Sequence, residues 1–135
     1  MWLASRSWRV FGLDLSEVAI RKLSRAALEL NLNLDLFVGD ASEYKFGSAQ
    51  FDLILLFYLA DRNLFPKVIS ALQPGGLLIC KLSLRWDTDA KLTAAATDAL
   101  NRNELPLLVP DLHVLYHEER QVRHRGVVEF AGRKA

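Results

Sequence analysis

The chain has 135 residues, of which 51% are hydrophobic and 24% charged, a composition typical of one soluble globular domain over residues 1–135. Its 17 lysines and arginines nearly balance its 16 acidic residues, so we expect no broad basic surface for nucleic acid or an anionic membrane. The single cysteine, Cys80, excludes a disulfide framework, and the longest apolar run, Leu53–Ala60, is too short to cross a bilayer; we expect a cytoplasmic protein without a secretory signal.

The first predicted elements are a strand and an amphipathic helix. Val10–Leu15 is a short apolar run with Asp14 near its end, and Ser16 is a good N-cap residue for the segment that follows. Between Glu17 and Leu30, apolar residues recur at spacings of three and four, with charged residues on the opposite side. This pattern predicts a helix whose apolar face packs on a sheet.

Two further strands are predicted before the middle of the chain. Leu34–Val38 is followed by Gly39 and Asp40, so an acidic residue again follows a strand. Phe51–Tyr58 is apolar on both faces except at Asp52, which is typical of a parallel strand covered by helices on each side.

A second helix and a fourth strand come next. Asp61–Asn63 precede an apolar segment that runs to Leu72, and Pro66 is tolerated there because it falls in the first helical turn. A sharp turn at Gln73–Gly76 leads to a buried strand, Leu77–Leu82. Strands and helices thus alternate with short joints, which predicts a doubly wound parallel sheet of the α/β class.

The last third of the chain has a different pattern. An alanine-rich helix is predicted over Thr88–Leu100 and a short helical turn at Asn103–Pro106. A strand begins at Leu112–His117, and the polar connection Arg120–Gly126 leads to a final strand, Val127–Ala131. Because so short a connection cannot hold a crossover helix, the last two strands are predicted to form an antiparallel hairpin at one edge of the sheet.

Several short segments together carry a family resemblance. They are Val10–Ser16 with the following Ala19-Ile20, then Val38–Ala41, Phe51–Ile54 and Leu72–Ile79. In this order and spacing the whole chain resembles the class I S-adenosylmethionine-dependent methyltransferases, in particular small bacterial proteins of the TehB-like (tellurite-resistance) and UbiE-like types. The resemblance implies a Rossmann-like fold with a reversed final strand, which nicotinamide-binding Rossmann domains lack. It also implies S-adenosyl-L-methionine as cofactor and a small-molecule methyl acceptor as substrate.

The N-terminal part departs from the pattern of that family. A first strand and a loop of the Gly-x-Gly-x-Gly kind precede the first helix in the family, whereas no glycine precedes Gly12 here. The resemblance therefore implies a domain whose first strand and glycine-rich loop are missing. That strand would lie between the strands Val10–Leu15 and Phe51–Tyr58. We expect the result to be marginal stability, weak cofactor binding and self-association through exposed sheet edges.

Two acidic residues at strand ends are the main candidates for cofactor binding. Asp14 is placed where a carboxylate accepts hydrogen bonds from both ribose hydroxyls of a nucleoside, with Leu15 packed against the adenine or ribose. The resemblance implies that Asp40 approaches the adenine amino group and that the Ala41 backbone N–H meets a ring nitrogen. The alternatives are structural: Asp14 as a helix-capping turn residue, and Asp40 as the acid of an Asx turn.

Aromatic residues end the third predicted strand. Phe57 stands where the family contacts its cofactor and substrate, although a place in the core is an equal alternative. Tyr58 is a weaker candidate because neighbours on a strand point to opposite faces. Asp52 begins the same strand and is expected to be structural, and Gly75-Gly76 is interpreted as a turn because no helix follows it.

Other reactive side chains are not assigned to the site. His113 and His117 are predicted on one face of a strand, about 13 Å apart, which is too far for one metal ion. Cys80 is predicted to be a packed core residue. No catalytic residue is named, because methyl transfer from a sulfonium requires only that the acceptor be aligned and water excluded. A thiol, a metalloid oxyanion, an amine or an enolised carbon fits equally as acceptor.

Three functions remain open from the sequence. The first is S-adenosylmethionine-dependent methyl transfer. The second is an NAD(P)-binding oxidoreductase, because an acid at a strand end also suits the ribose of NAD. The third is a non-catalytic remnant that serves as an interaction module.

Overall fold

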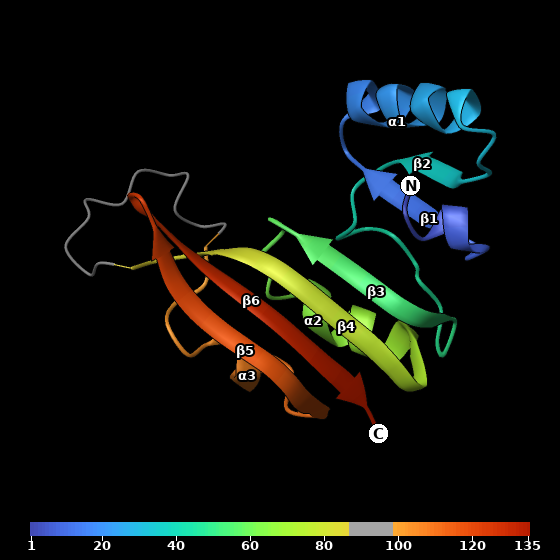
Figure 1. Ribbon diagram of the computed structural model, residues 1–135. Coiled ribbons are helices and arrows are strands. Elements are labelled where there is room, and N and C mark those ends of the chain that lie inside the picture. Colours follow the sequence, from blue (N-terminus) through green and yellow to red (C-terminus); the bar gives the residue numbers. More distant parts are fainter. Residues whose placement is uncertain (87–98) are drawn as a thin grey trace. The chain divides into compact units, whose positions relative to one another are not determined.

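The computed structural model describes residues 1–86 and 99–135. The chain divides into two compact units, Met1–Lys45 and Phe46–Ala135, and each contains a sheet of its own (Figure 1). The alanine-rich helix predicted over Thr88–Leu100 falls almost entirely outside the described residues. No described helix is long and apolar enough to span a membrane.

The first unit is a parallel strand pair with one long helix. Its elements are the 3-10 turn η1 (Ala4–Arg6), β1 (Phe11–Asp14), α1 (Glu17–Glu29) and β2 (Asp35–Val38). The side chain of Ser16 accepts a hydrogen bond from the N–H of Ala19 (3.2 Å), so the predicted N-cap is confirmed. Helix α1 packs on both strands, and Gly12 of β1 permits close packing because a Cβ there would lie 2.7 Å from Leu36 Cδ2.

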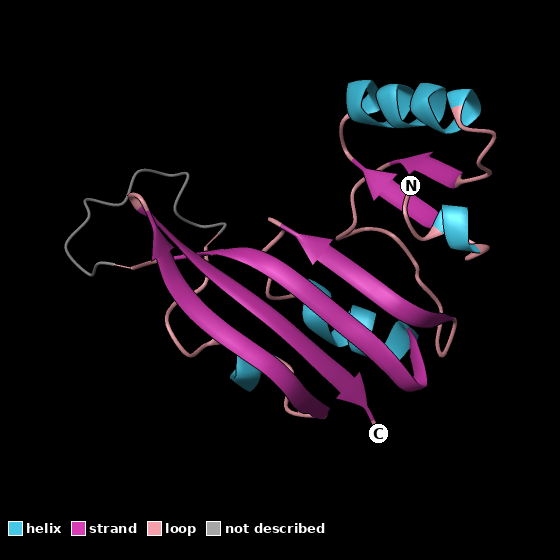
Figure 2. Cartoon of the chain, viewed as in Figure 1, coloured by secondary structure: helices cyan, strands magenta, loops and turns pink. Residues whose placement is uncertain are grey.

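The second unit is a four-stranded sheet with two helices. Its elements are β3 (Phe51–Phe57), α2 (Leu64–Ala71), β4 (Leu72–Leu84), α3 (Leu105–Leu108), β5 (Leu112–Val122) and β6 (Arg125–Lys134). The strand order is β3-β4-β6-β5, and β6 runs antiparallel to both of its neighbours (Figure 2). The remaining strands run in one direction. The predicted α/β fold and its C-terminal antiparallel hairpin are therefore confirmed.

One face of this sheet forms the core of the second unit. Phe65 and Val68 of α2 are completely buried. Alternate residues of β4 lie under them and pair with alternate residues of β6, and the buried pairs are Leu78–Gly132, Cys80–Phe130 and Leu82–Val128. Lys134 at the end of β6 donates to the carbonyls of Ile69 (2.9 Å) and Leu72 (2.8 Å), which joins the last strand to the end of α2.

Two connections differ from the sequence prediction. The segment Arg120–Gly126 is mostly strand, because β5 continues to Val122 and β6 begins at Arg125, which leaves a turn of two residues. Polar residues extend these strands because their side chains point to solvent. The turn at Gln73–Gly76 lies inside β4 as an irregularity, since the register jumps from the pair Phe51–Leu72 to the pair Leu53–Leu77.

A β-bulge in β5 places His113 and His117 differently from the sequence prediction. The β5–β6 register shifts between Val114 and Tyr116, so β5 has one extra residue there. His113 consequently faces Arg133, whereas His117 faces Phe130, three residues away on β6. The two histidines lie on opposite faces of the sheet, and the prediction of a shared face is wrong.

Candidate functional site

Two carboxylates lie at the same edge of the first unit. Strand β1 ends at Asp14, which pairs with Val38, the last residue of β2. The N–H of Gly39 donates to the carbonyl of Asp14 (3.0 Å), so the chain is still beside β1 when it reaches Asp40. The carboxyl ends of parallel strands are the usual place for ligands in open α/β sheets. This edge is our candidate functional site.

Each carboxylate is oriented by its own turn. Asp14 Oδ1 accepts a hydrogen bond from the N–H of Ser16 (2.7 Å), and Asp40 Oδ1 accepts one from the N–H of Ser42 (2.8 Å). Both acids therefore have the structural roles predicted as alternatives, Asp14 in the turn before α1 and Asp40 in an Asx turn. They do not exclude ligand binding, because both residues are exposed and a turn that uses one carboxylate oxygen also holds the group in place.

The other two candidates in this unit follow the acids directly. Leu15 is 71% exposed, which leaves its side chain free to cover a ligand. Ala41 is half-buried between Asp40 and Ser42. The sequence-predicted residues of the first unit are therefore all at the edge where β1 and β2 end.

The fifth candidate, Phe57, ends β3 in the second unit. Its side chain is 57% exposed, so the alternative that Phe57 belongs to the core is wrong. The next residue, Tyr58, is also exposed and has a left-handed backbone (φ 57°), and its N–H donates to the carbonyl of Lys81 (2.7 Å). An aromatic residue seldom adopts this conformation, and the strand alternation used to place Tyr58 does not apply there.

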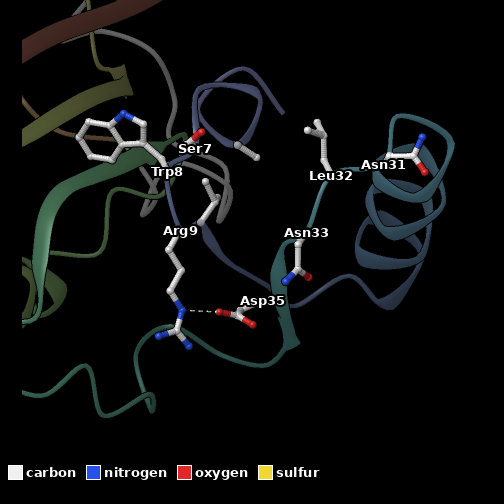
Figure 3. Close-up of a pocket in the computed structure, with 9 residues that line it drawn as sticks. Ser7, Trp8, Arg9, Asn31, Leu32, Asn33 and Asp35 are labelled. Atoms are coloured by element: carbon white, nitrogen blue, oxygen red, sulfur yellow. Dashed lines mark hydrogen bonds and ion pairs between the residues drawn. The ribbon is translucent and has the colours of Figure 1, made fainter.

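A shallow pocket lies at the opposite ends of β1 and β2 (Figure 3). Its volume is about 500 Å³, and its lining includes Trp8, Arg9, Asn33 and Asp35. Arg9 Nε lies 3.0 Å from Asp35 Oδ2 in an exposed ion pair. Because the pocket lies at the amino ends of the strands, we do not include it in the candidate site.

An ion pair in the second unit joins distant parts of the sequence. Arg62, which follows β3, contacts Glu104 through Nε (2.5 Å) and Nη2 (2.9 Å), and the N–H of Asn101 also donates to Glu104 (2.7 Å). The hydrogen bond from Arg62 holds the pKa of Glu104 below its ordinary value. This bidentate pair ties the segment after β3 to the segment before α3.

Glu104→Gln is expected to lower the free energy of unfolding by about 1 kcal/mol at neutral pH, since the partly exposed Arg62 limits the gain from the pair. Because the pKa of Glu104 is lower in the folded protein than its unfolded value of 4.5, the ion pair stabilises the fold at pH values above 4.5. This stability is lost as the pH falls through the folded pKa. The difference between wild type and variant should therefore shrink in acid. Urea unfolding from neutral to acidic pH measures it, with Asp52→Asn as the exposed carboxylate control. A pH-independent difference would contradict the electrostatic role.

Cys80 and the histidines do not add a reactive centre. Cys80 is 1% exposed, and burial raises the pKa of its thiol to about 12, so the prediction of a packed core cysteine is confirmed. Within the part of the chain that the structure describes, no group of three histidine, cysteine or acidic side chains is placed to hold a metal ion.

Comparison with known families identifies the chain. The profile of one family, described as a methyltransferase domain, matches residues 1–76, more than half of the sequence. The chain belongs to the methyltransferase domain family. Its resemblance to class I methyltransferases is thereby confirmed. No curated protein matches the sequence with significance.

Solved structures share the fold of this methyltransferase domain at low sequence identity. TehB from Haemophilus influenzae is similar over 99% of this chain and 52% of its own (TM-score 0.84, 18% identity). The [4+2]-cyclase SpnF is similar over 98% of this chain and 68% of its own (TM-score 0.81, 14% identity). A geranyl diphosphate C-methyltransferase from Streptomyces coelicolor A3(2), solved with Mg²⁺, geranyl diphosphate and S-adenosyl-L-homocysteine, is similar over 100% of this chain and 66% of its own (TM-score 0.77, 15% identity).

These structures establish the fold but not the reaction. The chain spans about half the length of TehB and about two thirds of the other two proteins. One of the three is described as a cyclase, so the same fold supports chemistry other than methyl transfer.

Proposed function

We propose that this methyltransferase domain binds S-adenosyl-L-methionine and transfers its methyl group to a small-molecule acceptor in the cytoplasm. The observation that carries the proposal is the pair of turn-oriented carboxylates, Asp14 and Asp40, at the carboxyl edge of β1 and β2. A nucleoside offers two vicinal hydroxyls and an amino group as donors, and carboxylates are acceptors for both. The family match and the cofactor-bound relative support this cofactor.

Each proposed contact has a separate chemical task. Asp14 accepts hydrogen bonds from the ribose hydroxyls, and exposed Leu15 covers an apolar face of the nucleoside. Asp40 accepts from the adenine amino group, while the N–H of Ala41 donates to a ring nitrogen. Phe57, in the second unit, stays a prediction from the family resemblance.

The proposed mechanism asks little of the side chains beyond binding. The cofactor supplies, when bound, an activated methyl on a sulfonium. The residues of this chain hold the nucleoside through directional hydrogen bonds and thereby set the direction in which the methyl points. No general base is assigned. An acceptor that is already a strong nucleophile, such as a thiolate or a metalloid oxyanion, would need none.

Asp14→Ala is expected to weaken binding of S-adenosyl-L-methionine by about 1–3 kcal/mol, roughly five- to 150-fold, because hydrogen bonds to a charged acceptor are lost. Isothermal titration calorimetry on the full chain measures this change. Asp14→Asn is the informative second variant, since an amide oxygen can still accept from the Ser16 N–H and preserve the turn. It should keep the thermal stability of wild type and still bind the cofactor more weakly.

The matched control is Asp52→Ala, which removes another exposed carboxylate at a strand start and should leave affinity unchanged. Equal affinity of wild type and both Asp14 variants would refute the ribose contact. Titration with NAD tests the oxidoreductase alternative on the same samples. Binding of neither nucleotide would favour the interaction module without catalysis.

The acceptor is approached by chemical class. The resemblance to the TehB-like (tellurite-resistance) type makes tellurite the first compound to test, followed by a thiol, an amine and an enolisable ketone. Formation of S-adenosyl-L-homocysteine above the rate without acceptor identifies the class.

A further inference from the structure

One face of the four-stranded sheet points away from α2 (Figure 1), and charged side chains gather at one end of it. Lys81 and Glu129 pair across β4 and β6. The neighbouring Cys80 lies in the core, so strand alternation turns Lys81 and Glu129 to the other face. Lys81 also pairs with Phe57, the last residue of β3. The charged group therefore lies at the carboxyl edge of the parallel strands of this unit, where open α/β sheets usually bind ligands.

Glu129 holds two cations of this group on a single carboxylate oxygen. Its Oε1 lies 2.8 Å from Lys81 Nζ and 2.9 Å from Arg120 Nη2. The hydrogen bonds from Lys81 and Arg120 lower the pKa of Glu129, so its carboxylate is ionised at neutral pH. The two cationic nitrogens are consequently less than about 6 Å apart, and an ammonium with three N–H donors and a guanidinium with five have more donors than Glu129 uses.

On the same face, the earlier residues of β3 and β4 are apolar. Leu53 and Leu55 of β3 pair with Leu77 and Ile79 of β4. Parallel strands whose faces serve only for packing stay apolar along their length. The change from Ile79 to Lys81 therefore marks the part of the face that is suited to a polar ligand.

Cations outnumber carboxylates at this end of the face. Strand alternation places Glu118 and Arg120 of β5, and Arg125 of β6, on the same side as Glu129. Of the residues that the structure describes there, Lys81, Arg120 and Arg125 are cationic, and Glu118 and Glu129 are acidic. One positive charge is left over, which matches the single negative charge of a carboxylate.

We propose, resting on the methyl transfer proposed above, that Lys81 and Arg120 bind a carboxylate group of the methyl acceptor. Two cationic nitrogens this close can each donate to one oxygen of the same carboxylate. Phe57, which pairs with Lys81, lies beside the rest of the acceptor. Glu129 is a positioning residue: it holds Lys81 and Arg120 together and competes with the acceptor for their N–H groups. The site selects anionic acceptors over neutral or cationic ones.

Arg120→Gln tests the inference with two thiols that differ in charge, 3-mercaptopropionate and 2-mercaptoethanol. Formation of S-adenosyl-L-homocysteine measures methyl transfer to each thiolate. The variant should lower kcat/KM at least about tenfold for the anionic thiol and less than about twofold for the neutral one, because only the first loses an ion pair. Arg133→Gln is the matched control: it removes an arginine from the same face, opposite Leu77 at the other end, and should change neither value. Equal effects of Arg120→Gln on the two thiols would overturn the inference.

Glu129→Gln separates ligand binding from a structural role of the ion pairs. The amide oxygen still accepts hydrogen bonds from Lys81 and Arg120, but the competing negative charge is gone. The KM for 3-mercaptopropionate should therefore fall at least about twofold, opposite in direction to the effect of Arg120→Gln, and the difference should shrink in high salt. A rise in KM in both variants would show that the network only supports the sheet.

An NMR titration of the full chain with 3-mercaptopropionate, without cofactor, tests the site apart from methyl transfer. The amide resonances of Lys81, Arg120 and Glu129 should shift in wild type and shift at least about fivefold less at the same concentration in Arg120→Gln. Such shifts without methylation of any thiol would support the carboxylate site and refute the proposed methyl transfer. Methylation of 2-mercaptoethanol without these shifts would refute the carboxylate site and leave the methyl transfer standing.

Discussion

Phe130→Ala is expected to lower the free energy of unfolding by about 3–5 kcal/mol, the usual cost of emptying a buried phenylalanine site. Phe130 is 1% exposed on β6, where it pairs with Cys80 of β4 and His117 of β5. Its ring lies edge-on to the His117 ring, with 6.3 Å between the centroids. Because domains are typically stable by about 5–15 kcal/mol, this loss is a large fraction of an ordinary domain's stability.

Urea unfolding measures this loss, followed by the fluorescence of Trp86, the one tryptophan in the sequence of the second unit. Phe57→Ala is the matched control, because it removes the same side chain from the same sheet at a position 57% exposed. We expect it to cost less than about 1 kcal/mol. Similar losses for the two variants would mean that β6 does not carry the core of the unit.

The elements predicted well are those defined by local signals. Helix α1 was expected from Glu17 to Leu30 and is observed over Glu17–Glu29, because its apolar period and its Ser16 cap are both contained in the local sequence. The C-terminal hairpin followed from a length argument alone, since a short connection cannot cross over the sheet.

The features that were missed depend on tertiary pairing. The bulge beside Leu115 reverses the face of His117, and nothing in the local sequence distinguishes it from continued alternation. Tyr58 likewise has a left-handed backbone, although the sequence has neither glycine nor asparagine at that position to predict one. The Arg62–Glu104 pair joins residues 42 positions apart, so the sequence shows only two opposite charges.

The candidate site was predictable because it depends on strand ends. Asp14 and Asp40 each follow an apolar run, and parallel strands bring such residues to one edge. The sequence contains no comparable pattern that identifies the methyl acceptor. Methyl transfer needs no dedicated catalytic group, and a fold shared with a [4+2]-cyclase does not select one reaction.

Gly126→Ala is the second change with a large expected effect, because Gly126 of β6 lies directly against the backbone of Leu84 on β4. A Cβ at this position would be 2.4 Å from the carbonyl oxygen and 3.0 Å from the carbonyl carbon of Leu84, its partner on β4. These are backbone atoms of the last pair of the β4–β6 ladder, so they cannot rotate away as a side chain can. We expect the added methyl group to lower the free energy of unfolding by about 3 kcal/mol, within the range for overpacked sites.

Gly75→Ala separates this steric effect from simple backbone strain. Gly75 has a positive φ (79°) but no atom within 4 Å of a Cβ, so its substitution should cost about 1 kcal/mol. Hydrogen exchange locates the damage: Gly126→Ala should lower the protection of the amides at Ser83 and Leu84, whereas Gly75→Ala should leave them protected. If Gly126→Ala is no more destabilising than Gly75→Ala, the strands have room to separate, and close packing of the reversed strand against β4 is not what holds this sheet together.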